Sequence, residues 1–147
     1  MNNLEKILPY LAYGVKIEIL NYKSDYVGIK NSEIDGYYYL LDSLHFNYKG
    51  GGVRGKSIKE IKIFLRPLSD LVNEISINSK TFIPKNILDE KHCSHWSYNN
   101  IKFINSTMLQ NAPFWFVQKL IEWNFDVFGL IEDGLAFPLR NVGEVIA

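Results

Sequence analysis

The residues of this chain whose types and spacing could do chemistry lie in one glycine-rich segment, at positions 50–57. Its string Gly-Gly-Gly-Val-Arg-Gly-Lys-Ser fits the pattern G-x-x-x-x-G-K-[ST] at every fixed position. In a phosphate-binding loop of this pattern, backbone N–H groups surround the phosphates of a nucleotide and the lysine side chain reaches them. The pattern therefore indicates a phosphate or nucleotide site at Gly50, Gly55, Lys56 and Ser57.

The residues on both sides of this segment favour a different structure. A phosphate-binding loop follows a buried parallel strand and leads into a helix that begins at the Lys-Ser pair. Before the glycines, apolar residues alternate with His45 and Asn47, whereas a buried parallel strand is continuously apolar. After them, residues 61–65 alternate as a strand does, and Pro67 would cut a helix short. We therefore predict a flexible hairpin loop over residues 49–57, and keep a nucleotide site and a non-catalytic anion-binding nest as alternatives.

A second group of chemically able side chains is His92, Cys93 and His95. An adjacent histidine and cysteine do not easily bind one zinc ion, and no second pair of ligands stands at the usual spacing. Neighbours in the chain also rarely reach the geometry of a nucleophile and its base. We expect a polar surface loop here, and predict no catalytic residue, metal or cofactor.

Aromatic and basic residues also gather near the glycines. Three consecutive tyrosines at 37–39 stand near Tyr48 and near four lysines, Lys49, Lys56, Lys59 and Lys62. Stacking aromatics with basic flanks are typical of single-stranded nucleic-acid binding. Because strand neighbours point to opposite faces, only part of the set can be exposed together. We favour a half-buried sheet and keep nucleic-acid binding as an alternative.

The clearest helix prediction covers residues 113–123, with Asn111 or Ala112 as its cap. At 100° per residue the apolar arc contains Phe114, Phe116, Val117, Leu120, Ile121 and Trp123. Trp115 falls instead among polar neighbours that include Lys119 and Glu122. Tryptophan often anchors protein interfaces, so these three residues, with Arg54 of the glycine-rich segment, are candidates for contact with a partner protein. The alternative is that the N-terminal segment covers Trp115.

Composition bounds the class of protein. The 147 residues carry sixteen basic and sixteen acidic side chains, so no overall field draws the chain to nucleic acid or to an acidic membrane. The single cysteine, Cys93, excludes an internal disulfide and fits a reducing compartment. The first residues lack the pattern of an export signal, and no apolar stretch reaches membrane-spanning length. We expect a cytoplasmic protein without membrane contact.

The chain reads as a single α+β domain over residues 1–147, an antiparallel β-meander or small open barrel with two to four packed helices. Alternation and turn signals predict strands, and the 3.6-residue period predicts helices. The predicted helices are 4–8, stopped by Pro9, a short one at 68–75, one from Pro84, and 113–123. The predicted strands are 15–20, 26–30, 37–41 after a turn at Asp35-Gly36, 44–48 paired with 61–65, a hairpin at 75–83, and 135–139.

Two segments resemble a family of small uncharacterised phage and prophage proteins. They are residues 64–71, Phe-Leu-Arg-Pro-Leu-Ser-Asp-Leu, and residues 123–136, Trp-Asn-Phe-Asp-Val-Phe-Gly-Leu-Ile-Glu-Asp-Gly-Leu-Ala. The opening at residues 9–14 and the Phe-Ile-Pro turn at 82–84 fit the same likeness. The resemblance brings no assigned activity and no site residue. It implies context, because small phage accessory proteins often bind a host protein or sequester a ligand, including as inhibitors of bacterial defence systems.

The function expected from these observations is binding. The leading hypothesis is a non-enzymatic phage or mobile-element protein in the host cytoplasm that binds or inhibits a host protein, with anti-defence activity as one form. The first alternative is a nucleotide, phosphate or other ligand-sequestering protein that uses the glycine-rich segment. The second is a single-stranded nucleic-acid binder. The oligomeric state stays open.

Overall fold

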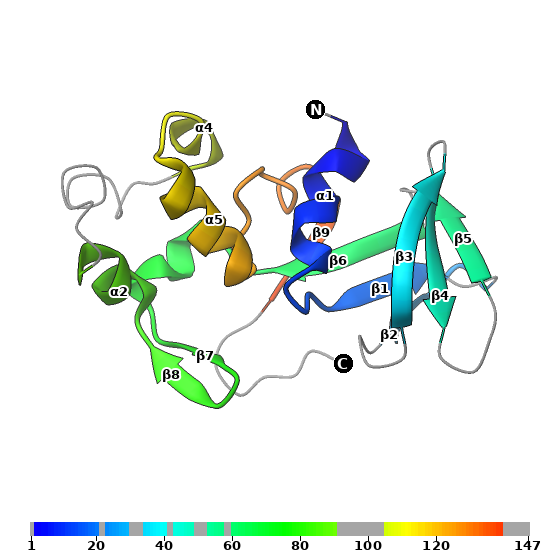
Figure 1. Ribbon diagram of the computed structural model, residues 1–147, viewed down its shortest axis with the longest axis horizontal. Helices are drawn as coiled ribbons and strands as arrows, with labels where there is room; N and C mark the ends of the chain where they lie inside the picture. Colours follow the sequence, from blue (N-terminus) through cyan, green and yellow to red (C-terminus); the bar gives the residue numbers. More distant parts are fainter. Residues whose placement is uncertain are drawn as a thin grey trace.

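The computed structural model describes residues 2–20, 23–29, 34–40, 43–48, 53–57, 60–90 and 105–139. In these residues the helices are α1 (Asn3–Leu11), the 3-10 helix η3 (Leu68–Val72), α2 (Pro84–Glu90), α4 (Ser106–Leu109) and α5 (Phe114–Glu122). The strands are β1 (Ile17–Leu20), β2 (Tyr26–Ile29), β3 (Ile34–Leu40), β4 (Ser43–Tyr48), β5 (Val53–Ser57), β6 (Ile61–Leu65), β7 (Ile75–Ile77), β8 (Lys80–Phe82) and β9 (Ala136–Pro138). The predicted α+β class with packed helices is confirmed (Figure 1).

The central sheet has the strand order β2-β1-β6-β9. β1 pairs antiparallel with β2 and with β6, which confirms the predicted return strand. The predicted last strand also forms, but β9 joins β6 in parallel and makes the sheet mixed. Alternate residues place Ile17, Ile19, Ile61 and Ile63 in the core, where all four are buried.

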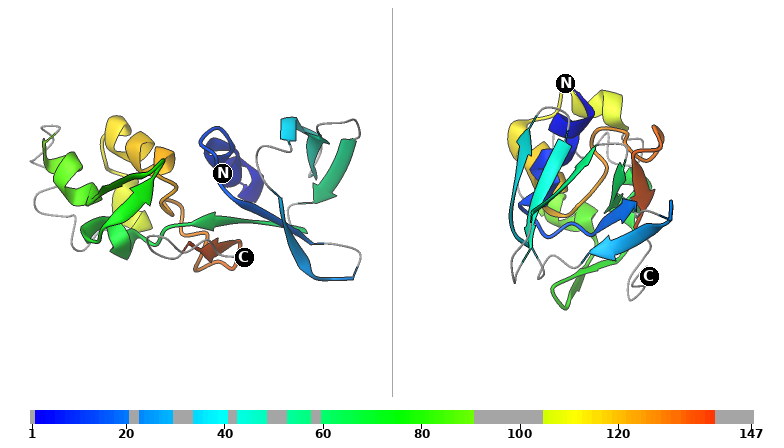
Figure 2. Two further views of the ribbon diagram at one scale, coloured as in Figure 1. Left: turned by 90° about the horizontal axis from the view of Figure 1, so that it is seen from below. Right: turned by 90° about the vertical axis from the view of Figure 1, so that its right-hand side faces the viewer.

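The first helix is longer than its sequence predicts. It begins after Asn2, whose side-chain oxygen accepts the backbone N–H of Glu5, while the Glu5 carboxylate accepts the N–H of Asn2. The expected stop at Pro9 is wrong, because α1 continues to Leu11. The proline removes one helical hydrogen bond, but the extra turn places Tyr10 fully in the core. α1 then lies over the central sheet, as Figure 2 shows from the side.

β3, β4 and β5 form a separate antiparallel sheet at one end of the molecule (Figure 1). The turn expected at Asp35-Gly36 is wrong, because both residues lie within β3, where the register shifts between Ile34 and Gly36. The predicted pairing of 44–48 with 61–65 is also wrong. β4 pairs with β5, because the glycine-rich segment itself extends beside it, and β6 is left free to join the central sheet.

The β7–β8 hairpin and the helices η3, α2, α4 and α5 lie at the other end of the central sheet (Figure 1). The predicted hairpin is confirmed, with positive φ angles of 51° at Asn78 and 65° at Ser79, as a two-residue hairpin turn requires. The helix expected over 68–75 is the shorter η3, because Ile75 belongs to β7. α2 begins at Pro84 as predicted.

α5 also forms where the sequence places it, but Pro113, and neither Asn111 nor Ala112, is its N-cap. A single cluster of buried apolar residues then connects α5 with α1 and both larger sheets. Among the side chains that the structure describes, Leu44 of β4 brings the second sheet into this cluster and has no exposed surface.

Candidate functional site

The segment that follows α5 is fixed by two buried side chains. The Tyr10 hydroxyl of α1 donates to the carbonyl of Phe125 over 2.6 Å and accepts the backbone N–H of Val127 over 3.0 Å. Burial raises the pKa of Tyr10 well above its usual value, with a further contribution from the charge of Asp126, while the bond from Val127 acts in the opposite direction. The Asp126 carboxylate accepts the backbone N–H groups of Leu130 and Ile131, over 2.8 and 2.9 Å. These hydrogen bonds hold the backbone of residues 125–131 in place, and this segment forms one wall of the pocket described next.

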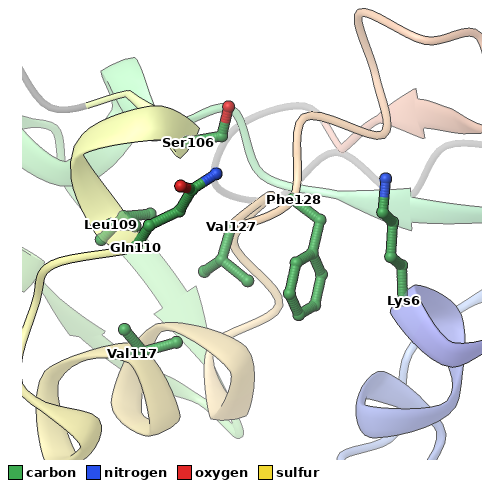
Figure 3. Close-up of a pocket in the computed structure, with 7 residues that line it drawn as sticks. All are labelled: Lys6, Ser106, Leu109, Gln110, Val117, Val127 and Phe128. Carbon is green, nitrogen blue, oxygen red and sulfur yellow. The ribbon is translucent and has the colours of Figure 1, made fainter. Parts of the chain in front are cut away.

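A pocket of about 280 Å³ opens beside this wall. We call it the Lys6 pocket; its lining residues come from α1, α4, α5 and the segment after α5, and are Lys6, Ser106, Leu109, Gln110, Val117, Val127 and Phe128 (Figure 3). In that view Val127 and Phe128 lie between Lys6 on one side and α4 on the other. Sequence-distant segments thus meet at one hollow.

The walls of the Lys6 pocket are apolar and ordered. Leu109 and Val127 are buried, with 4% and 3% of their surface exposed. The ring of Phe128 packs edge-on against Tyr10, with 6.3 Å between ring centroids and 89° between planes. The Tyr10 side chain therefore holds the pocket wall twice, through its hydroxyl group and through its ring.

Local sequence features place α4 against the same wall. The side chain of Asn105 accepts the N–H of Met108 over 2.9 Å and so starts the helix at Ser106. Opposite it, Gly129 has a φ of +72°, and a Cβ atom there would lie 3.2 Å from the Ser106 hydroxyl oxygen. The missing side chain lets the loop approach α4 closely.

Among the described residues, three polar groups line this otherwise apolar pocket. Lys6 is half-buried, Ser106 is half-buried and Gln110 is exposed. Within the part of the chain that the structure describes, none of these three side chains makes a hydrogen bond or an ion pair. Ser106 and Gln110 are four residues apart and so lie on the same side of α4, one turn from each other. An ammonium, a hydroxyl and an amide are therefore available to a ligand.

The residues that the sequence marks for phosphate binding lie elsewhere. Gly55, Lys56 and Ser57, with Arg54, follow one another along β5, and Gly50 lies outside the described residues. The expected flexible loop is wrong over Val53–Ser57, because these residues pair with β4 in a regular register. A phosphate-binding loop would place the Lys-Ser pair at the start of a helix, whereas here both residues belong to an antiparallel strand.

The residues of α5 that were predicted to contact a partner protein differ in their exposure and contacts. Trp115 is half-buried, packs on the core and meets Phe116 edge-on at 5.5 Å, whereas Phe114, expected on the apolar arc, is 80% exposed. The prediction that Phe114 faces the core and Trp115 faces solvent is therefore wrong. The face of α5 that packs on the core is centred on Phe116 and includes Trp115 in place of Phe114. Lys119 and Glu122 form an ion pair over 3.2 Å.

The other predicted sites are placed only in part. His92, Cys93 and His95 lie outside the described residues; among those described, no three His, Cys, Asp or Glu side chains could hold a metal ion. Tyrosines 37–39 lie in β3, but Lys62 lies in β6 of the other sheet, with its ammonium 4.7 Å from the centroid of the Phe137 ring. Tyr48 and Lys56 lie in the same sheet as the three tyrosines, in β4 and β5, whereas Lys49 and Lys59 lie outside the described residues. The described part of the predicted set is therefore together in one sheet except for Lys62. No helix in the described residues is long and apolar enough to cross a membrane.

Comparison with protein families, with curated proteins and with solved structures finds no match for the chain. The resemblance to phage proteins therefore stays a prediction. The two segments that carry it do lie side by side. The backbone N–H of Arg66 donates to the carbonyl of Asn124 over 2.7 Å, and the N–H of Asp126 donates to the carbonyl of Arg66 over 2.9 Å.

Proposed function

We propose that this protein acts by binding and not by catalysis, and that the Lys6 pocket holds a small carboxylate with an apolar body. The observation that supports this most strongly is that Lys6, Ser106 and Gln110 line one pocket with apolar walls, none of the three having a side-chain partner in the described residues. Ligand pockets are mostly apolar, with a few polar groups that fix orientation. The arrangement matches that description.

The pocket favours an anionic ligand that is otherwise apolar. A lysine ammonium is charged at neutral pH, and a hydrogen bond to a charged group contributes about 1.5–3 kcal/mol. The Ser106 hydroxyl and the Gln110 amide can donate to a carboxylate as well. Apolar ligand surface against Leu109, Val127 and Phe128 adds roughly 25 cal/mol for each Å² removed from water. The volume of about 280 Å³ lies below the usual range for drug-sized ligands and so suits a small molecule.

The test compares benzoate with benzamide, which has the same ring and no charge. Backbone amide signals are followed by NMR during titration to about 10 mM, which detects binding as weak as about −3 kcal/mol. Benzoate should shift the signals of residues 106–110 and 127–129, and benzamide should do so less. Lys6→Gln should remove this difference, and Val117→Phe should block both ligands by filling the pocket. Lys80→Gln, an exposed lysine of β8, is the matched control and should bind as the wild type does.

Absence of benzoate binding, or equal binding of both ligands by the wild type, would refute a carboxylate site at Lys6. Benzoate binding that persists in Val117→Phe would show that the ligand binds outside the Lys6 pocket. The first result is measured on the wild type and the second requires a variant that still binds, so misfolding of a variant cannot produce either result.

We further propose association with a host protein in the host cytoplasm as a second function, in line with the resemblance to small phage proteins; anti-defence activity is one form that such binding takes. The observation in its favour is Phe114, a large aromatic side chain that is 80% exposed at the start of α5. Phenylalanine is among the residue types that are enriched in protein interfaces. Affinity capture from bacterial lysate should recover the same protein with the wild type and with Lys80→Gln, and lose it with Phe114→Ser. Equal recovery by all three would refute Phe114 as the anchor.

A further inference from the structure

A second hollow, of about 530 Å³, lies beyond the end of β6, between the β7–β8 turn and the residue that follows α5. We call it the Arg66 hollow. The lining residues that matter here are Lys16, Phe64, Arg66, Glu122 and Asn124. In contrast to the Lys6 pocket, its lining is rich in hydrogen-bonding groups, and it contains two cationic side chains and one carboxylate.

The guanidinium group of Arg66 is already held in place. Its Nη1 donates to the carbonyl of Trp123 over 2.7 Å, and its Nη2 donates to the carbonyl of Ser76 over 3.3 Å. These bonds use two of the five N–H groups that a guanidinium offers, so others remain for a ligand. Burial lowers the pKa of Arg66, and the charge of Asp70 acts in the opposite direction. Arginine nevertheless stays charged in proteins.

Lys16 brings the second cation to this hollow. Its ammonium lies 4.7 Å from the centroid of the Phe64 ring and 3.7 Å from Oε1 of Glu18, with 28% of the side chain exposed. The carboxylate of the lining, Glu122, is 3.2 Å from the ammonium of Lys119. The carboxylate of Glu122 is thus paired with a lysine outside the lining, and Arg66 and Lys16 both line the hollow.

Asn124 supplies a buried acceptor. It follows the C-terminus of α5 with a φ of +60°, and the bonds from Asn124 N–H to Ile121 and from Phe125 N–H to Leu120 complete a Schellman motif. Its Oδ1 is shielded from solvent and has no hydrogen-bond partner among the described residues. An unsatisfied buried acceptor costs about 1–3 kcal/mol. Asn124 also lines the hollow, and the last torsion of an asparagine side chain has a broad minimum, so the amide can turn to meet a donor there.

We propose that the Arg66 hollow is a separate binding site for an oxyanion, a carboxylate or a phosphate, on a small molecule that also carries an N–H donor. The anion contacts the free N–H groups of Arg66 and the Lys16 ammonium. The donor satisfies Oδ1 of Asn124. Planar guanidinium groups suit the oxygen pairs of both anions.

The experiment titrates the protein with three probes: acetate, N-acetylglycine, which adds an amide N–H to the carboxylate, and inorganic phosphate. Backbone amide signals at residues 14–16, 64–66, 76–78 and 124 report the site by NMR. N-acetylglycine should bind more tightly than acetate, by about two- to tenfold for one added hydrogen bond. The order of phosphate and acetate tells which oxyanion the hollow prefers.

Three variants make this test specific. Lys16→Gln should weaken all probes, by about tenfold for a lost charge-assisted bond. Asn124→Gly keeps the backbone conformation and should remove the advantage of N-acetylglycine over acetate. Lys62→Gln is the control, because Lys62 lies on the same central sheet but its ammonium faces the Phe137 ring, outside the hollow.

Binding by Lys16→Gln that equals the wild type, or no shift at these residues with any probe, would overturn the site. Equal affinity of the wild type for acetate and N-acetylglycine would overturn the role of Asn124. These results are independent of the Lys6 pocket, whose signals lie at residues 106–110 and 127–129.

Discussion

Arg66 Nη1 donates a hydrogen bond of 2.7 Å to the carbonyl oxygen of Trp123, the C-cap residue of α5. The last carbonyls of a helix have no partner within it and carry partial negative charge, so a cation beside them stabilises them. The same guanidinium reaches Ser76 of β7. One side chain thus joins the end of the central sheet, the C-terminus of α5 and the β7–β8 hairpin.

Arg66→Ala should therefore lower the free energy of unfolding by about 3 kcal/mol, because it leaves two partly buried carbonyls without a donor. Arg66→Lys keeps the charge but not the fork of two donors, and should cost about half as much. Urea denaturation followed by circular dichroism gives both values. A cost below about 0.5 kcal/mol for Arg66→Ala, a typical surface value, would contradict this role.

Tyr10→Phe removes one buried hydroxyl that serves both Phe125 and Val127, and should cost about 1–3 kcal/mol at pH 7. The burial that raises the pKa of Tyr10 adds a pH dependence. Above pH 10 the unfolded tyrosine loses its proton while the folded one keeps it, so the wild type loses stability as the pH rises. Below pH 10 both states keep the proton and the contribution is constant.

The measurement is the difference in unfolding free energy between wild type and Tyr10→Phe at several pH values. This difference should shrink by about 1.4 kcal/mol per pH unit above pH 10, because the variant lacks the titrating group and all other groups cancel. A difference that stays constant from pH 9 to pH 11 would mean that Tyr10 ionises equally in both states.

Local patterns in the sequence predict most elements of this fold and the pairing of strands that are neighbours in the chain, but not the pairing of distant strands. The β7–β8 hairpin and α5 depend on residues close in the chain, such as Asn78 and Ser79 at the turn, and both are confirmed. The pairing of β4 was predicted wrongly because residues 53–57 show no apolar alternation that marks a strand, whereas residues 61–65 do. Residues 61–65 are not available to β4 because, as β6, they pair with β1 and β9 in the central sheet, and both of these strands are distant in the chain.

The candidate pocket could not be predicted for the same reason. Lys6 lies more than a hundred residues before Gln110, the helix α5 separates Gln110 from Phe128, and no motif connects the three residues. The available signals were indirect: Asn105 before Ser106 as a helix cap, and Gly129 as a position for close approach. The glycine-rich motif was the stronger pattern, yet its spacing describes a loop, and it does not specify the helix that a phosphate site also needs.

Asn124 should tolerate glycine better than alanine. Its φ of +60° is in the left-handed region, where a Cβ atom costs about 1–2 kcal/mol and glycine costs nothing sterically. Asn124→Ala should therefore be less stable than Asn124→Gly by about 1 kcal/mol in urea denaturation. The reverse order would show that the Schellman motif at the end of α5 is not kept in solution, and would remove Asn124→Gly as a fold-preserving variant of the Arg66 hollow.

Phe114 and Phe116 make a matched pair on α5, two residues apart and opposite in burial. Phe114 is 80% exposed, so Phe114→Ser should change the free energy of unfolding by less than about 0.5 kcal/mol. Phe116 has no exposed surface, so Phe116→Ala should cost about 3–5 kcal/mol. If Phe114→Ser proved as costly as Phe116→Ala, the ring would be covered within the folded chain and could not anchor a partner. If it proved neutral while abolishing capture of a host protein, stability would have no part in that loss, and Phe114 itself would be the contact.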